Sequence, residues 1–138
     1  MEFSKEQALL AIDRERVPIC TASDQVWENP ETAFQEFKSV DILCELLEKE
    51  GFHVERNLAG IATAFSGTYG HGKPVVGILG EFDALSGLSQ EAEKTEKIAI
   101  VDGALGHGCC HNLLGTGSLA AAVAVKEYLE KNNKEGTV

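Results

Sequence analysis

The sequence predicts an α/β fold, and three features of its hydrophobic pattern support this prediction. Apolar residues recur at three- and four-residue steps through residues 31–50, which is typical of an amphipathic helix. Short alternating or wholly apolar runs at residues 52–56 and 75–79 favour strands. A stretch at residues 113–132, apolar through residue 125, predicts a further helix. Helices and strands in this order are typical of a sheet flanked by helices.

The first element is a helix over residues 4–27. Ser4 is the predicted N-cap, with Gln7 in the capping-box position. Pro18 lies inside the helical pattern and predicts a kink or break, because proline lacks the amide donor. Pro30 predicts a helix restart at a first helical position.

The second helix is predicted over residues 31–50, with Gly51 as its C-cap. Its buried stripe consists of Phe34, Phe37, Val40, Leu43 and Leu47. Residues 52–56 and 61–69 are predicted strands, and residues 70–74 form a glycine-rich turn.

Residues 75–79 are wholly apolar and predict a buried central strand. Residues 86–106 are predicted to be a long loop, of the kind that is usually functional or mobile. The helix at 113–132 is apolar on nearly every face over residues 113–125, which predicts close packing on both sides. Residues 137–138 begin another strand.

Composition excludes several classes of partner. The 138-residue chain is 43% hydrophobic and carries a net charge of −10, so a nucleic acid or an anionic membrane is not an expected partner. The start of the chain has no secretory signal, and no apolar run is long enough to span a bilayer. We therefore expect a cytoplasmic protein.

Four cysteines are present, and in a reducing compartment they should be thiols or metal ligands. Cys20 and Cys44 lie in helical patterns and are predicted to be small core residues. Cys109 and His111 stand two residues apart, so in an extended loop both face one side. Thiolate and imidazole suit zinc, whereas the alternative is a buried cysteine beside a helix-capping histidine. Cys110 either fills space or forms a redox-active pair with Cys109.

Two acids follow the apolar run at 75–79. Asp83 and Glu81 could bind a metal ion or orient a ligand imidazole, and the alternatives are a cap, a turn or a solvated acid. His53 and His71 are assigned no role, and His107 beside the cluster is left open.

Three segments together resemble a known family. They are residues 80–90 (GEFDALSGLSQ), residues 107–116 (HGCCHNLLGT) and residues 27–32 (WENPET). They resemble the p-aminobenzoyl-glutamate hydrolase group of the zinc metallopeptidases. That family also includes aminoacylases, carboxypeptidases and indoleacetyl-amino-acid hydrolases.

The resemblance implies the N-terminal portion of a catalytic metal-binding domain across residues 1–138, incomplete, with a mixed sheet flanked by helices. The lid and dimerisation domain is absent from this stretch. In the family, two divalent metal ions, zinc or manganese, support hydrolysis of the amide bond of an N-acyl or N-aroyl amino acid. The resemblance makes Cys109 and His111 metal ligands, with the cysteine commonly bridging, and places Asp83 in an orienting role. It gives Glu81 no ligand role. A small dipeptide-like substrate and a homo- or hetero-oligomer are expected for the complete protein.

Two departures from the family pattern bear on activity. Cys110 replaces a glycine, which costs on the order of 1 kcal/mol if that position needs a positive φ. The catalytic glutamate pair lies outside the 138 residues, so we expect this stretch alone to be inactive. The alternatives are a non-catalytic truncated homologue and a thiol-based metal-binding or redox protein.

Overall fold

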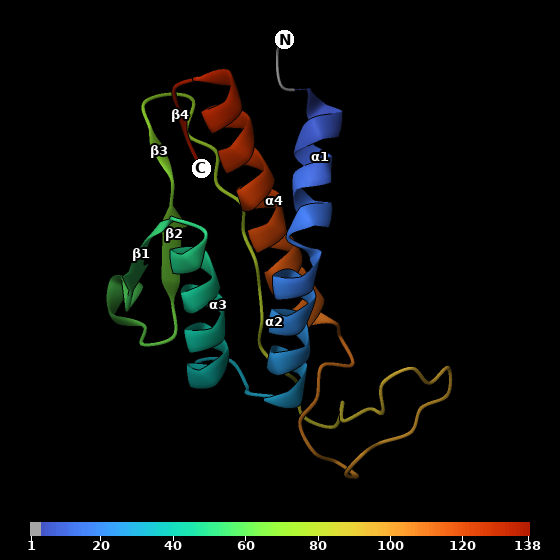
Figure 1. The fold of residues 1–138 in the computed structure, drawn as a ribbon. Helices are drawn as coiled ribbons and strands as arrows, with labels where there is room; N and C mark the ends of the chain where they lie inside the picture. The colour runs from blue at the N-terminus through green and yellow to red at the C-terminus, as the bar shows by residue number, and fades with distance from the viewer. Residues whose placement is uncertain (1–3) are drawn as a thin grey trace.

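The computed structural model describes residues 4–138 and confirms the α/β class (Figure 1). The described elements, in chain order, are α1 (Lys5–Arg14), α2 (Arg16–Glu28), α3 (Phe37–Lys49), β1 (His53–Arg56), the short 3₁₀ helix η1 (Leu58–Gly60), β2 (Phe65–Thr68), β3 (Gly70–His71), α4 (His111–Asn132) and β4 (Gly136–Thr137). Helix α4 packs against α1 and α2, and the strands and α3 lie on its other side (Figure 1).

The predicted first helix is two helices, with the break at Glu15. Ser4 caps α1 through the predicted capping box with Gln7. The break lies three residues before Pro18 and so places the proline in the first turn of α2. There its missing N–H is not needed by the helix.

The start of α3 corrects the prediction. The helix begins at Phe37, not at residue 31, so Pro30 does not start it. The reason is a side-chain cap: the Glu31 carboxylate accepts hydrogen bonds from the Lys38 and Ser39 amides at 3.0 and 2.9 Å, and from the Ser39 hydroxyl at 2.9 Å. An acid at a helix N-terminus satisfies free amides and complements the helix dipole.

The end of α3 follows the prediction. Gly51 has a φ of 83°, and its amide donates to Glu48 while the Phe52 amide donates to Leu47. This pair of bonds is a Schellman motif, in which a glycine takes the left-handed conformation at low cost. The chain then enters β1, which pairs antiparallel with β2 from His53 opposite Thr68 to Arg56 opposite Phe65. The second strand is shorter than predicted, starting at Phe65.

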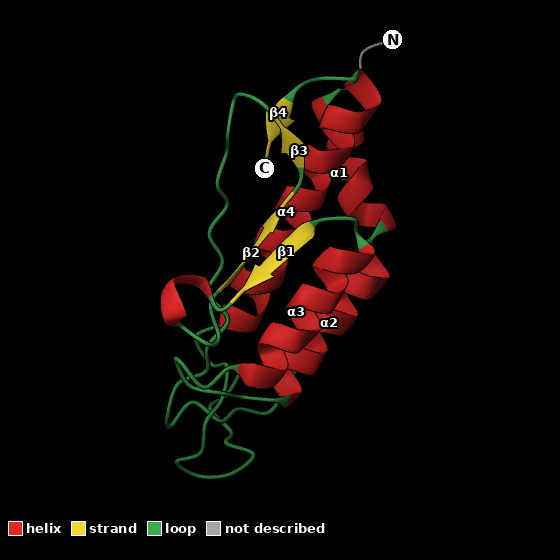
Figure 2. Cartoon of the chain, turned by 90° about the vertical axis from the view of Figure 1, so that its left-hand side faces the viewer, coloured by secondary structure: helices red, strands yellow, loops and turns green. Residues whose placement is uncertain are grey.

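A second small sheet combines both strand directions. β4 pairs antiparallel with β3 and forms a parallel bridge from Thr137 to Val75. The prediction that a strand begins at residues 137–138 is therefore confirmed. The two sheets lie beside α3 and α4 (Figure 2).

The prediction of a buried central strand at residues 75–79 is wrong. Beyond the single bridge at Val75 the segment forms no ladder within the described chain, and Figure 2 draws it as a loop running alongside β2. Val75 is 69% and Leu79 is 84% exposed. A central strand needs neighbours along both edges, and here only the two residues of β4 provide one.

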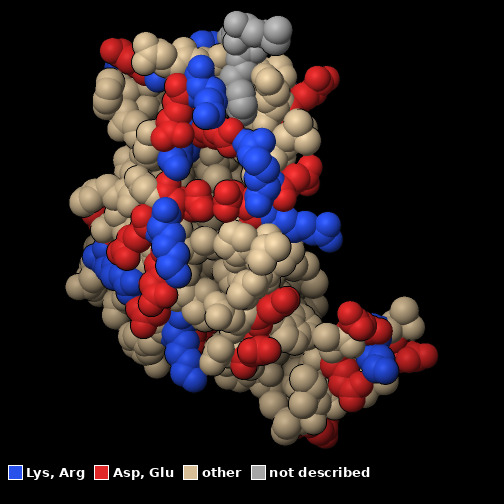
Figure 3. Space-filling model, in the orientation of Figure 1, with Lys and Arg blue, Asp and Glu red and all other residues tan. Residues whose placement is uncertain are grey.

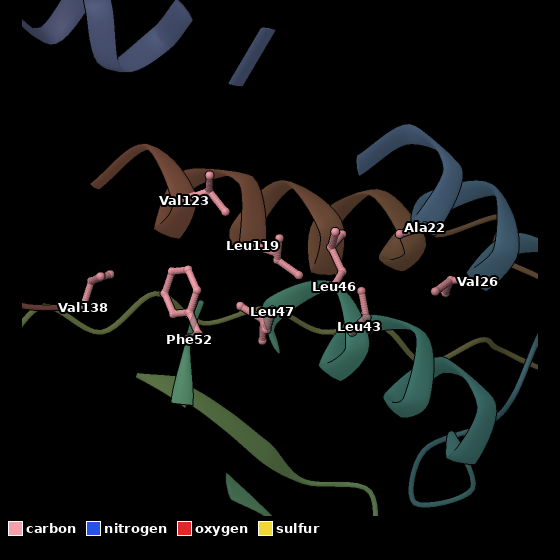
Figure 4. Packing of buried hydrophobic residues seen from close by; sticks show 9 residues of the cluster. All are labelled: Ala22, Val26, Leu43, Leu46, Leu47, Phe52, Leu119, Val123 and Val138. Carbon is pink, nitrogen blue, oxygen red and sulfur yellow. The ribbon is translucent and has the colours of Figure 1, made fainter. Parts of the chain in front are cut away.

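The core lies between α2, α3 and α4 (Figure 4). Its buried members are Ala22, Val26, Leu43, Leu46, Leu47, Phe52, Leu119, Val123 and Val138. Cys44 is fully buried as predicted, but Cys20 is exposed on α2, so its assignment to the core was wrong. Helix α4 starts at His111, two residues before the predicted start, and it has neighbours on both sides as predicted, except near its start, where Leu113 and Leu114 are 58% and 45% exposed.

Residues 86–106 form the predicted long loop, which projects from the rest of the molecule below α2 in the view of Figure 1. Acidic and basic side chains are interspersed over the face shown in Figure 3, with no broad basic area on that face. None of the described helices is both long enough and apolar enough to span a membrane.

Candidate metal centre

Residues 79–85 are held at both ends, which fixes the acids between them. The Ser118 hydroxyl donates to the Leu79 carbonyl at 2.8 Å. At the other end the Ala84 amide donates to the Glu31 carbonyl at 2.6 Å, and Leu85 exchanges two 3.1 Å bonds with Gly106. The segment carrying Glu81 and Asp83 therefore lies across the N-terminal half of α4.

Close packing against a glycine allows this approach. A Cβ at Gly115 would lie 3.0 Å from the Phe82 Cβ and 3.1 Å from the Glu81 carbonyl oxygen. Gly115 thus lets the acidic segment pass directly over the first turns of α4, where His111 begins the helix.

Cys110 turns the chain into α4. It is the N-cap residue, with a left-handed φ of 65°, and its carbonyl accepts from the Leu113 and Leu114 amides. The predicted extended geometry of the Cys109 and His111 pair is therefore wrong, because a left-handed residue separates them. Cys110 does have the positive φ expected at a position where the family pattern has glycine. For a residue with a Cβ this conformation costs on the order of 1 kcal/mol of folding free energy.

The structure brings three side chains, those of Asp83, Cys109 and Glu81, together around the His111 ring. Nδ1 of His111 lies 2.7 Å from an Asp83 carboxylate oxygen. Nε2, on the other side of the ring, lies 3.5 Å from the Cys109 sulfur and 3.5 Å from a Glu81 carboxylate oxygen. The side chains of His111 and Asp83 are 18% and 21% exposed, whereas Glu81 is 57% exposed. The cluster is thus anchored on its buried side and open on the other.

This arrangement fits a divalent metal ion. A tetrahedral zinc ion that binds nitrogen at about 2.0–2.1 Å and sulfur at about 2.3 Å places those two ligand atoms about 3.5 Å apart. The distance of 3.5 Å from Nε2 to the Cys109 sulfur matches that spacing. The side chains whose ligand atoms all lie within 4.8 Å of one another are Glu81, Asp83 and His111, and Cys109 is outside that group. A ligand histidine also needs its second nitrogen held by a carboxylate or carbonyl, which Asp83 provides.

Glu81 is named from the sequence as a possible metal ligand or orienting acid, whereas the family resemblance gives it no ligand role. Together with Asp83 and His111 it offers ligand atoms that all lie within 4.8 Å of one another. The signal was present in the sequence, since Glu81 and Asp83 are two positions apart after an apolar run. Their placement against His111, however, depends on the packing over Gly115.

His107 is a buried histidine four residues before His111 in the sequence. It is 1% exposed, and its ring centroid is 6.3 Å from that of Trp27. Neither ring nitrogen has a partner of regular geometry among residues 4–138. Burial lowers the pKa of His107, and the Val26 backbone opposes part of that shift. The ring therefore favours the neutral form and packs as a core residue under the loop.

The other two histidines lie outside the cluster. His53 is in β1 with its side chain 78% exposed, 4.0 Å from Glu55, and His71 is exposed in β3. All four cysteines are free thiols, with Cys109 and Cys110 exposed.

Comparison with known proteins gives a specific similarity. No protein-family model matches the chain. The chain is 48% identical over 128 residues to the B subunit of p-aminobenzoyl-glutamate hydrolase from Escherichia coli (strain K12). The match covers 93% of this chain and 27% of that protein, so the chain spans about a quarter of the relative's length. The resemblance seen in the motifs is thereby confirmed: over almost all of its length, this chain is similar to a subunit of p-aminobenzoyl-glutamate hydrolase.

Proposed function

We propose that these residues form the metal-binding part of an amidohydrolase. The complete protein would cleave the amide bond of an N-acyl or N-aroyl amino acid, with p-aminobenzoyl-glutamate as the model substrate. One observation carries the proposal: Nε2 of His111 lies 3.5 Å from the Cys109 sulfur and 3.5 Å from a Glu81 carboxylate oxygen, while Nδ1 lies within hydrogen-bond distance of Asp83. The name of the relative supports the reaction class.

Each residue has a distinct role in this proposal. Cys109 and His111 hold the metal, and Glu81 supplies a carboxylate on the same side of the ring. Asp83 fixes the His111 tautomer, so that the Nε2 lone pair faces the metal. Divalent ions such as zinc or manganese, two of them in the complete enzyme, supply polarisation of the scissile carbonyl and a lowered pKa of bound water.

Further features of the complete protein are part of the proposal. Residues 1–138 belong to the catalytic domain, and a separate lid and dimerisation domain lies elsewhere in the protein. The relative's name describes it as one subunit of a hydrolase, which supports an oligomer acting on a small molecule. A cytoplasmic location stays a prediction.

Zinc titration of the purified 138-residue chain tests the metal site. Calorimetry should show binding that is lost in Cys109→Ser and His111→Ala. Asp83→Asn should weaken binding about 10- to 100-fold, because it removes the orienting carboxylate. Cys110→Ser is the matched control and should bind as the parent does. The proposal fails if the parent chain does not bind zinc, or if binding survives the loss of both Cys109 and His111.

Two further measurements separate the alternatives. Zinc should protect Cys109 but not Cys110 from alkylation, whereas paired oxidation of the two thiols would support a redox protein. Hydrolysis of p-aminobenzoyl-glutamate should be absent from the 138-residue chain and metal-dependent in a protein of the relative's length. Absence of hydrolysis in that longer protein would favour a non-catalytic homologue.

A further inference from the structure

A cavity of about 400 Å³ lies between the end of α2 and the long loop, at the lower end of the molecule in Figure 1. Its apolar lining comes from both segments and consists mainly of Trp27, Pro30, Ile100, Val101 and Leu105. The side chains that form the candidate metal centre do not line it. The volume lies in the range of small-molecule pockets, about 300–1,000 Å³, which are mostly apolar with a few polar groups.

His107 is the buried polar group of this cavity. It lines the cavity, is 1% exposed, and has no regular hydrogen-bond partner for either ring nitrogen among residues 4–138. Burial lowers the pKa of His107, and the Val26 backbone opposes this shift as an acceptor for one N–H. A neutral imidazole has one donor nitrogen and one acceptor nitrogen. The second nitrogen of His107 is therefore a buried acceptor that requires a donor, because buried polar groups in native structures are paired.

Ser89 adds a second polar group to the lining. It is 8% exposed, and its hydroxyl oxygen accepts a hydrogen bond from the Val101 amide at 3.2 Å. A hydroxyl group can accept and donate at once, so the O–H of Ser89 can also donate into the cavity.

The loop side of the cavity is held in one shape by Gln90. Its side-chain nitrogen donates to the Glu91 and Glu96 carbonyls at 3.1 and 3.0 Å, and its side-chain oxygen accepts from the Ile98 amide at 3.1 Å. The Glu91 amide also donates to the Ile98 carbonyl at 2.8 Å. A wall that is already ordered loses little conformational entropy when a ligand binds, which favours binding.

We propose that this cavity binds a planar aromatic molecule that carries a hydrogen-bond donor, such as a phenolic hydroxyl or an aromatic amine. The aromatic ring packs beside Trp27 and the apolar loop residues, and its donor bonds to the acceptor nitrogen of His107. The exposed carboxylate of Glu28 also lines the cavity and disfavours an anionic ligand. This site is separate from the metal centre and does not rest on the proposed hydrolase activity.

Two matched probes test the proposal on the 138-residue chain. The probes p-ethylphenol and p-ethylanisole have the same aromatic body, but methylation removes the donor from the second. Trp27 is the only tryptophan of the chain, so its fluorescence reports binding in the cavity. The phenol should bind about 10-fold more tightly than the anisole, because only the phenol pairs with the buried acceptor.

Three variants assign this preference to its residue. His107→Phe keeps an aromatic ring without the acceptor, so it should bind both probes about equally. His71→Phe removes an exposed histidine outside the cavity and should keep the preference. Cys109→Ser, which should lose zinc binding, should also keep it. Loss of the preference in Cys109→Ser would assign probe binding to the metal centre and overturn the proposal.

A measurement on the parent chain makes the test independent of whether the variants fold. The ¹⁵N chemical shift of the His107 acceptor nitrogen should move when p-ethylphenol is added and stay unchanged with p-ethylanisole. Circular dichroism checks the fold of each variant. The proposal is overturned if the parent binds neither probe, if it binds both equally, or if a folded His107→Phe chain still prefers the phenol.

Discussion

Helix α3 and residues 75–79 are both rich in apolar residues, but they have opposite environments. Leu46 on α3 is 7% exposed and lies in the main hydrophobic cluster, whereas Leu79 is 84% exposed. The helix satisfies its backbone internally and needs neighbours on one face only. The extended segment needs strand partners on its edges as well as cover on its faces, and it has one short partner. An apolar pattern therefore predicts that a segment can be buried. It does not predict whether neighbouring strands or helices are present to bury it.

The largest expected effect contrasts the same substitution in both regions. Leu46→Ala should lower the free energy of unfolding by about 2–5 kcal/mol, because it opens a cavity in a packed core. Leu79→Ala should change it by about 0.5 kcal/mol or less, since the side chain is mostly in water. Urea denaturation of both variants measures this contrast. Equal losses would mean that residues 75–79 are buried in solution.

A smaller effect is expected from two glycines of α4. Gly115→Ala should destabilise by about 1–3 kcal/mol, because the added methyl group crowds Phe82 and the Glu81 carbonyl. Gly117 has no heavy atom within 4 Å of an added Cβ, so Gly117→Ala should stabilise by up to about 1 kcal/mol through helix propensity.

Thermal unfolding of both glycine variants gives the sign of each change. Zinc affinity adds a second readout, since displacement of Glu81 should weaken binding in Gly115→Ala only. A stabilising Gly115→Ala would contradict the close packing that positions the acids.

The smallest expected effect is a difference in reactivity between the buried thiol of Cys44 and the exposed thiols. Burial raises the pKa of Cys44 from 9.0 to about 11, so its thiolate is disfavoured in the folded protein. In metal-free protein at pH 8, iodoacetamide should modify the exposed Cys20, Cys109 and Cys110 faster than Cys44.

The same shift predicts a pH dependence of stability. The contribution of Cys44 is complete below pH 9 and is lost as the pH rises from 9 to 11, because the unfolded state then releases the thiol proton first. The matched control, Cys44→Ala, should remove this part of the alkaline decline in unfolding free energy. An unchanged decline would assign it to other groups.

The sequence by itself determined the local elements and pointed to the residues of the candidate site. The Ser4 capping box, the glycine that ends α3 and the apolar length of α4 are local signals, and each appears in the structure close to its predicted place. Cys109, His111 and Asp83 were likewise identified from residue type and from a resemblance that the 48% identity confirms.

Only the tertiary structure decided three other features. The start of α3 depends on the Glu31 carboxylate, which reaches amides seven and eight residues ahead. The position of Glu81 beside His111 depends on contact across Gly115, between segments about thirty residues apart in the sequence. The exposure of residues 75–79 depends on which strands are present to pair with them. The physical reason is common to all three. Caps, ligands and strand partners that are distant in the sequence act through contacts in space, and hydrophobic periodicity does not say which distant segments come into contact.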